Sequence, residues 1–244
     1  MTVRAPISGL AEGERELPAE TSHYLCRVRR LGPGARFVGF DPDARTEADA
    51  EVVDASTTAA RVKIGAVRAA RVVAGTGLVL VYALAKGDKV DDVVRDATEL
   101  GATRIVIART ERAVVKAAGE RAKEKLDRWR RIIEQAARQC GRADPPEIVG
   151  VLDWADALER ASDCDARFCL DPRAVEMLGA ALAPAVERAG SIAFAIGPEG
   201  GLSGDEVEVA VGKGFLPASL GPFILRTETV AAAVLGAVRV LASG

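Results

Sequence analysis

The sequence predicts an α/β fold preceded by a small β-rich domain, and three observations support this. From Leu78 onward, apolar runs alternate with amphipathic helical stretches, as in a mainly parallel sheet covered on both faces. Before about residue 74, short alternating runs dominate. The stretch Ala-Gly-Thr-Gly at 74–77 separates the two patterns. We therefore expect a β-rich domain over 1–74 and an α/β domain over 75–244.

In the first domain, the runs at 36–40, 50–55 and 61–73 predict strands. The spacing of apolar residues also predicts one helix over 18–30, with Leu25 and Val28 facing inward and Gly32 after its end. This domain is expected to be mainly β.

In the second domain, strands and helices are expected to alternate. A helix over 88–100 places five apolar residues on one face and ends at Gly101, and a longer helix runs over about 120–140. The later strands are each followed by helical sequence. The predicted strands are 78–84, 104–108, 147–151, 167–170, 191–196 and 216–220.

The last predicted helix, 227–242, is mostly Ala, Val and Leu and has one charge after Glu228, at Arg239. Helices that are apolar all round are buried. Because one domain rarely surrounds a terminal helix, a subunit interface is the expected second cover. We therefore predict a homodimer.

The composition is that of a globular chain. Of its 244 residues, 49% are hydrophobic and 28% are charged, which argues against a disordered or collagen-like protein. The first ten residues lack a signal peptide's pattern, and no stretch approaches 18 uncharged apolar residues. We expect a cytoplasmic protein without a membrane span.

The cysteines and the histidine do not indicate a metal site. The four cysteines contain no C-x-x-C pair, and His23 is the one histidine. We interpret the cysteines as buried thiols and expect no metal.

Basic residues are concentrated locally although the net charge is −2. Eight basic residues and three acidic ones lie within 121–142, and four arginines lie near the turn at 31–34. Such patches are typical of phosphate contacts. A solvated helix face is the alternative for 121–142.

Two loops after predicted strands combine features of a ligand site, since ligands of parallel sheets bind beyond the strands' carboxyl ends. Gly197, Gly200 and Gly201 follow one strand and precede a capping box of Ser203 and Glu206. The segment 221–229 carries Arg226, Thr227, Glu228 and Thr229 after apolar residues. The first loop could equally be a tight turn, and Arg226 with Glu228 an ion pair. Neither glycine-rich stretch, 75–77 or 197–201, is a P-loop or a dinucleotide fingerprint.

Taken together, IGPEGGLSGDE at 196–206 and LGPFILRTET at 220–229 resemble the RsmE family of 16S ribosomal RNA uridine-N3 methyltransferases, which are SPOUT (class IV) methyltransferases. Further matches are HYLCRVRRLGPGA at 23–35, ALAKGDKVDDVVRDATELGATRI at 83–105, TERAVVK at 110–116 and RWRRIIEQAARQCGRADPPEI at 128–148.

The resemblance implies an N-terminal PUA-like β-barrel that binds RNA and a SPOUT-type domain with a trefoil knot that holds S-adenosylmethionine. It also implies a homodimer acting on 16S rRNA of the small ribosomal subunit. The implied cofactor-binding residues are Leu170, Asp171, Gly197, Pro198, Glu199, Gly200, Gly201, Leu220, Gly221, Ile224, Leu225 and Thr229. The expected RNA-binding residues are Arg29, Arg30, Arg112, Lys116 and Arg142.

The chemistry suggests roles for two residues. Uridine N3 carries a proton and pairs in duplexes, so an enzyme must present an unpaired base and help remove that proton. We expect Arg226 to stabilise negative charge on the uracil oxygens, and Glu228 or a path to solvent to take the proton. Two other classes remain open at this point: a non-catalytic RNA-binding assembly factor and a metabolic enzyme for a phosphorylated small molecule.

Overall fold

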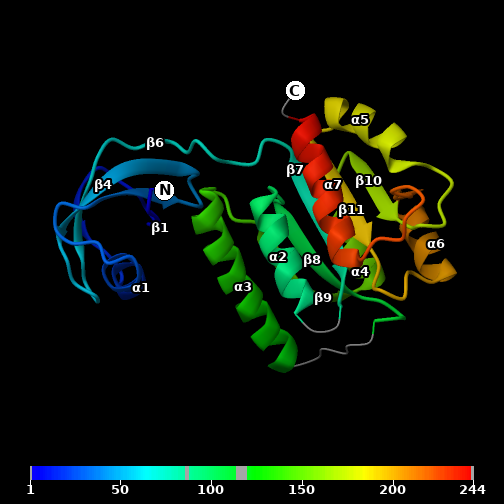
Figure 1. Cartoon of the computed structure of the whole chain (residues 1–244), viewed down its shortest axis with the longest axis horizontal. Helices are drawn as coiled ribbons and strands as arrows, with labels where there is room; N and C mark the ends of the chain where they lie inside the picture. Colours follow the sequence, from blue (N-terminus) through cyan, green and yellow to red (C-terminus); the bar gives the residue numbers. More distant parts are fainter. Residues whose placement is uncertain (1, 86–87, 114–119, 243–244) are drawn as a thin grey trace. The chain divides into compact units, whose positions relative to one another are not determined.

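The computed structural model of the chain describes residues 2–85, 88–113 and 120–242 (Figure 1). The chain divides into two compact units. Unit 1 consists of Met1–Val73 and Ala137–Pro145, and unit 2 of Ala74–Ala136 and Pro146–Gly244. Each unit has its own hydrophobic core.

Unit 1 is built on one sheet with the strand order β1-β3-β4-β5-β2, and β6 pairs with β4. β1 runs parallel to β3, and the remaining pairs are antiparallel. The predicted strand 61–73 is two short strands, and β1 and β2 were not predicted. The strands are β1 (Arg4–Pro6), β2 (Gly13–Glu16), β3 (Arg36–Asp41), β4 (Thr46–Asp54), β5 (Arg61–Ile64) and β6 (Arg68–Ala69).

The helix predicted over 18–30 is a short α1 (Ala19–Ser22) followed by a π-helix, η1 (His23–Val28). The backbone N–H of Arg29 donates to the carbonyl of Tyr24, five residues earlier, at 2.9 Å. The wider π turn separates positions that an α-helix would place on one face. Leu25 is fully buried as predicted, whereas Val28 is 59% exposed, so its predicted inward position is wrong.

Unit 2 contains a six-stranded parallel sheet in the order β12-β10-β11-β7-β8-β9, which confirms the predicted α/β class. Its strands are β7 (Gly77–Ala83), β8 (Arg104–Arg109), β9 (Glu147–Asp153), β10 (Ala166–Leu170), β11 (Ser191–Ile196) and β12 (Leu216–Ala218). Its helices are α2 (Lys89–Glu99), α3 (Glu120–Cys140, whose last residues belong to unit 1), α4 (Trp154–Glu159), α5 (Leu178–Arg188), α6 (Gly204–Gly212) and α7 (Thr227–Leu241).

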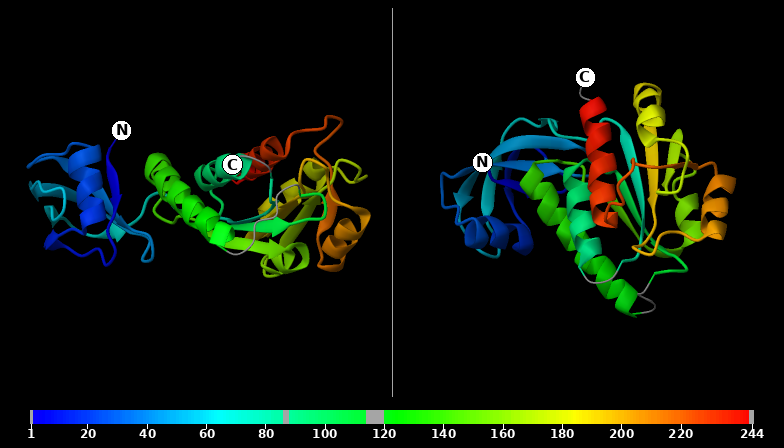
Figure 2. Two further views of the ribbon diagram at one scale, coloured as in Figure 1. Left: turned by 90° about the horizontal axis from the view of Figure 1, so that it is seen from below. Right: turned by 45° about the vertical axis from the view of Figure 1, so that its right-hand side comes forward.

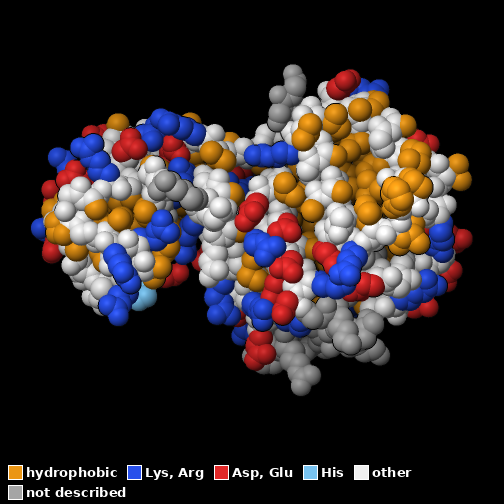
Figure 3. All heavy atoms as spheres, viewed as in Figure 1, with side chains coloured by type: hydrophobic (Ala, Val, Ile, Leu, Met, Phe, Trp, Pro, Cys, Tyr) orange, Lys and Arg blue, Asp and Glu red, His pale blue; other side chains and the backbone are white. Residues whose placement is uncertain are grey.

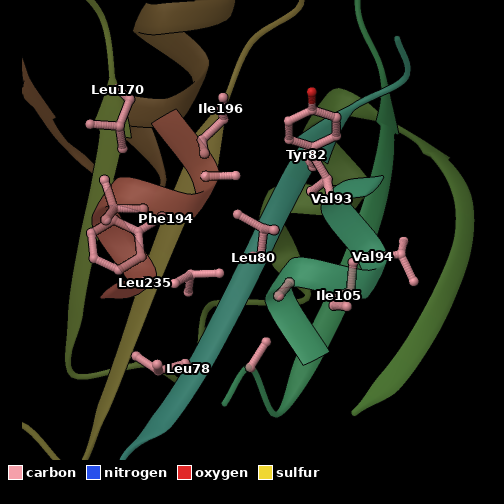
Figure 4. Packing of buried hydrophobic residues seen from close by; sticks show 14 of the residues in the cluster. Leu78, Leu80, Tyr82, Val93, Val94, Ile105, Leu170, Phe194, Ile196 and Leu235 are labelled. Atoms are coloured by element: carbon pink, nitrogen blue, oxygen red, sulfur yellow. The ribbon is translucent and has the colours of Figure 1, made fainter. Parts of the chain in front are cut away.

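Helices cover both faces of the unit 2 sheet (Figure 2). Because side chains alternate along a strand, Leu78, Leu80 and Tyr82 of β7 face the core formed with α2 and α7 (Figure 4). Val79 and Val81 face the second core, with α4 and α6. This two-sided burial explains the continuous apolar runs in the sequence.

The last helix, α7, buries one face in the core of its own chain. Ala231, Val234, Leu235 and Val238 are buried there, whereas Val240 is 76% exposed. The predicted burial of this helix is therefore confirmed for its inner face, and the predicted cover of its other face by a second subunit stays a prediction. Its inner face is covered without a second subunit.

Two further predictions concern cysteines and membrane spans. Cys164 and Cys169 are buried, and burial raises the pKa of Cys169 to about 12. Cys26 and Cys140 are half-buried, so the interpretation as buried thiols holds for two of the four, all of which are free. No helix within the described ranges is long and apolar enough to cross a membrane.

We predict that Val234→Asp lowers the free energy of unfolding by at least about 3 kcal/mol, because it places an unpaired carboxylate in the core. Urea unfolding followed by circular dichroism measures the change. Val209→Asp on the exposed side of α6 is the control and should change stability by less than about 1 kcal/mol. Equal destabilisation by both variants would contradict the assignment of the inner face.

Candidate functional site

A pocket of about 510 Å³ lies at the carboxyl edge of the unit 2 sheet. The loops after β10, β11 and β12 line it, together with Arg112 and the start of α7. In the sheet, Leu170 of β10 is in register with both Ile196 of β11 and Ala218 of β12. The predicted residues that line the pocket are Arg112, Leu170, Asp171, Gly197, Pro198, Glu199, Gly200, Gly201, Leu220, Gly221, Ile224, Leu225 and Arg226.

Other predicted site residues lie elsewhere. Glu228 and Thr229 are in the first turn of α7, beside the pocket and not among its lining residues. Arg29 and Arg30 are exposed in unit 1, and Lys116 lies outside the described residues.

Arg142 requires a correction. It is buried, and its guanidinium Nε donates to Asp144 Oδ1 at 3.1 Å. Because the side chain is enclosed in unit 1, it does not present its charge at the surface, and we remove it from the RNA contacts.

The glycine-rich loop after β11 is held in a fixed conformation. A Cβ at Gly197 would lie 2.8 Å from Leu202 Cγ, and Gly201 has a φ of +70°. Either position disfavours a larger side chain. The predicted capping box is confirmed: Glu206 N–H donates to Ser203 Oγ, and Ser203 N–H donates to Glu206 Oε2 at 2.9 Å. The loop therefore enters α6 through a well-defined cap.

Two arginines tie the neighbouring loops to this one. Arg112 Nη1 donates to the carbonyl of Gly200 at 3.0 Å, so Arg112 belongs to the pocket wall. Arg173 pairs with both oxygens of the buried Asp171 and also donates to the carbonyl of Leu202 at 3.1 Å. Hydrogen bonds from Arg173 hold the pKa of Asp171 below its usual range.

A polar chain runs along the other side of the pocket. Lys89 Nζ lies 2.9 Å from Glu199 Oε1 and 3.6 Å from Glu228 Oε2. Thr227 Oγ1 donates to Glu228 Oε2 at 3.2 Å and lies 2.8 Å from Tyr82 Oη. Since the threonine hydroxyl has one proton, Tyr82 must donate to it. Burial raises the pKa of Tyr82 to about 12, so the phenol keeps its proton.

Lys89 and Arg173 were not predicted from the sequence. Both follow the carboxyl ends of parallel strands, β7 and β10, where ligands of such sheets bind, but neither belongs to a glycine-rich loop. Arg226, by contrast, is exposed and has no carboxylate within ion-pair distance among the described residues, so the alternative of an Arg226–Glu228 ion pair is not found.

The outer wall of the pocket is apolar and exposed. Phe223 and Ile224 are 78% and 88% exposed, and Val175 and Met177 nearby are also open to solvent. Figure 3 shows hydrophobic side chains gathered over α5 and the adjoining loops of unit 2. A patch of this kind is typical of a surface that binds a ligand or a partner.

No group of three or more His, Cys, Asp or Glu residues in the described part of the chain is arranged to hold a metal ion.

An open parallel sheet with a pocket at the carboxyl ends of three neighbouring strands is the arrangement of a ligand-binding α/β protein. Residues 75–239 match the model described as RNA methyltransferase domain, and residues 17–65 match the one described as RNA methyltransferase PUA domain. The chain belongs to the RNA methyltransferase domain family.

Individual relatives agree with this family. The chain is 36% identical over 164 residues to ribosomal RNA small subunit methyltransferase E of Synechocystis sp. and 33% identical over 159 residues to that of Bacillus subtilis. These alignments cover 66% and 64% of this chain and 52% and 62% of the relatives. The chain thus spans about half to three fifths of the length of the curated relatives it matches.

Two solved structures are similar over almost their whole length. A Legionella pneumophila protein with bound cofactor SAM has a TM-score of 0.88 at 30% identity, covering 98% of both chains. Ribosomal RNA small subunit methyltransferase E of Neisseria gonorrhoeae, bound to S-adenosyl methionine, has a TM-score of 0.88 at 26% identity, covering 99% of this chain and 98% of that chain. Together the comparisons confirm the resemblance to the RsmE family.

We predict that Arg173→Met lowers the free energy of unfolding by about 1–2 kcal/mol at pH 7, because Asp171 then stays buried without its cation. Burial alone raises the pKa of a carboxyl group, so the variant's deficit should shrink as the pH falls and Asp171 takes up a proton. Wild type should instead lose stability over that range, since its Asp171 pKa is lowered.

Urea unfolding between pH 3 and pH 7 tests this, with Arg188→Met on the exposed side of α5 as the control. A deficit that stays constant with pH would argue against the Asp171 pairing.

Proposed function

We propose that the protein binds S-adenosylmethionine in the pocket of unit 2 and transfers the methyl group to N3 of a uridine in 16S rRNA of the small ribosomal subunit. The observation that carries the proposal is the convergence of the loops after β10, β11 and β12 on one pocket, in a chain of the RNA methyltransferase domain family. The named relatives act on small-subunit ribosomal RNA, and two similar structures hold the same cofactor.

The pocket residues fit this cofactor. The pocket's volume of about 510 Å³ lies in the usual range of small-molecule sites. The close approach at Gly197 and the left-handed conformation of Gly201 bring backbone groups to the pocket without side chains in the way. We assign the binding to Leu170, Asp171, 197–201 and 220–225. When bound, S-adenosylmethionine supplies an electrophilic methyl group on a sulfonium ion.

Arg226 is the proposed catalytic cation. It lines the pocket, is exposed, and has a guanidinium without an ion pair among the described residues. Negative charge develops on the uracil oxygens as N3 loses its proton, and a positioned cation stabilises such charge. Because no carboxylate of the described ranges pairs with it, the guanidinium is available for this role.

Glu228 is the proposed acceptor for the N3 proton. A hydrogen bond from its own backbone N–H, followed by the ion pair with Lys89, holds the pKa of Glu228 below its usual range against the effect of burial. The carboxylate is therefore ionised at neutral pH and ready to accept a hydrogen bond from N3–H. Because a low pKa makes it a weak base, we propose that the proton passes on to solvent.

We propose that 1–74 binds RNA and that 75–244 carries out catalysis, with 137–145 of the second range packed in unit 1. The PUA-domain match over 17–65 supports the division. Arg29 and Arg30 are exposed at the end of η1, and Arg30 has a φ of +57°, which is uncommon for a residue with a side chain. We propose that these two arginines contact RNA phosphates, and that the sheet of unit 1 forms the PUA-like barrel.

We further propose a homodimer, a trefoil knot and a cytoplasmic location, where the ribosomal substrate is. The exposed apolar side chains of Val175, Phe223 and Ile224, with Val240 at the end of α7, offer a surface that a second subunit would cover. The knot is proposed from the family resemblance, and the adjacency of β10, β11 and β12 is compatible with it.

Methyl transfer to small ribosomal subunits, followed by identification of the modified nucleoside, tests the function. Wild type should yield N3-methyluridine.

We predict that Arg226→Lys keeps most of the cofactor affinity but lowers the single-turnover rate by about 10²- to 10³-fold, because an ammonium does not reproduce the planar guanidinium. A near-wild-type rate in the folded, cofactor-saturated variant would exclude the catalytic role of Arg226.

RNA binding should depend on salt through Arg29 and Arg30. Each phosphate contact contributes roughly 0.7–0.9 to the slope of log affinity against log salt, so charge reversal of both arginines should flatten the slope by about one to two units. Filter binding at several salt concentrations measures it, with Arg188→Glu as the control. An unchanged slope in the double variant would move the RNA contacts elsewhere.

A further inference from the structure

Lys89 occupies an unusual position among the charged residues of unit 2. It is the first residue of α2, just beyond the carboxyl end of β7, and its ammonium contacts two carboxylates from different parts of the chain. Glu199 belongs to the glycine-rich loop that lines the pocket. Glu228 belongs to the first turn of α7.

The two carboxylates share a single cation. Both have a carboxylate oxygen within 4 Å of Lys89 Nζ, so the two negative charges are close to each other. The hydrogen bond to Glu199 raises the pKa of Lys89, so the ammonium is charged at neutral pH. Without the Lys89 ammonium, the two negative charges would remain at short range and repel each other. That repulsion would separate the glycine-rich loop from the start of α7.

The Glu228 oxygen that lies near Lys89 also accepts a hydrogen bond, which fixes its orientation. Oε2 accepts from Thr227 Oγ1, which in turn accepts from the fully buried Tyr82. Figure 4 shows the Tyr82 hydroxyl directed away from the hydrophobic cluster that holds its ring. Two contacts therefore hold Glu228: Tyr82 in the core acts through Thr227, and Lys89 of α2 acts directly. The same ammonium holds the loop that carries Glu199.

We propose that Lys89 is a positioning residue: by holding Glu199 and Glu228 on one ammonium, it fixes the glycine-rich loop against α7 and keeps the Glu228 carboxylate directed for the target base. This inference rests on the proposed function, which supplies the ligand and the base. The role is distinct from stabilising the fold, since partly exposed ion pairs of this kind contribute little to stability.

Calorimetric titration with S-adenosylhomocysteine tests the first half of the proposal. Lys89→Met should fold with the melting temperature of wild type and bind the ligand roughly tenfold more weakly. Lys89→Arg should restore most of the affinity because it keeps the charge. In Lys89→Met with Glu228→Gln, part of the affinity should return, since one of the two repelling charges is gone and Glu228 does not line the pocket.

Lys213→Met is the matched control. The side chains of Lys213 and Lys89 are exposed to a similar degree. Lys213 pairs with Glu159 at 2.5 Å, and neither Lys213 nor Glu159 lines the pocket. This variant should bind S-adenosylhomocysteine as wild type does.

The pH dependence of single-turnover methylation at saturating cofactor tests the second half. The charged or titratable groups facing Glu228 in the described structure are Lys89 of α2, Glu199 of the loop after β11 and Tyr82 of β7. Loss of Lys89 removes the one cation among them, so the acid limb of the profile should move to higher pH in Lys89→Met. Lys213→Met should leave the limb unchanged.

The outcomes separate the two levels of the argument. If wild type does not bind S-adenosylhomocysteine, the proposed function is wrong and the role of Lys89 falls with it. If wild type binds but Lys89→Met matches Lys213→Met in affinity and in pH profile, the positioning role alone is overturned. The positioning role would also be overturned if Lys89→Arg bound S-adenosylhomocysteine no more tightly than Lys89→Met.

Discussion

The pocket depends on the parallel pairing of β10 with both β11 and β12. This pairing places Leu170 between Ile196 and Ala218, so the three strands end side by side. The chain must then leave the sheet three times at the same edge. Each exit provides a loop, and the three loops enclose the pocket. A shift of any of these strands would displace one wall.

Short electrostatic and hydrogen-bonding links keep the loops in place. Arg173 joins the loop after β10 to Leu202, Arg112 holds Gly200, and Lys89 joins Glu199 to Glu228. The Arg173 link also neutralises the buried Asp171, whereas the partly exposed links through Arg112 and Lys89 add little to global stability. Their effect is local, because they restrict loops that would otherwise move independently. Such restriction is the usual requirement for a preorganised site.

Much of this arrangement could be predicted from local sequence patterns. The alternation of apolar runs indicated the parallel sheet, and the glycines with the capping box located the loop before α6. Local patterns do not report on contacts between distant segments, which is why Lys89 and Arg173 were missed. They also do not distinguish an exposed arginine from one like Arg142, whose partner Asp144 lies in the same buried turn. The π-helix at 23–28 escaped prediction because its apolar spacing resembles that of an α-helix.

The central claim is that the loops after β10, β11 and β12 form a site for S-adenosylmethionine. Isothermal titration of the wild-type protein with S-adenosylhomocysteine tests this most directly, because it requires neither RNA nor turnover. The account predicts saturable binding of one molecule per chain, which excess S-adenosylmethionine prevents by competition. Absence of saturable binding by the folded protein would contradict it.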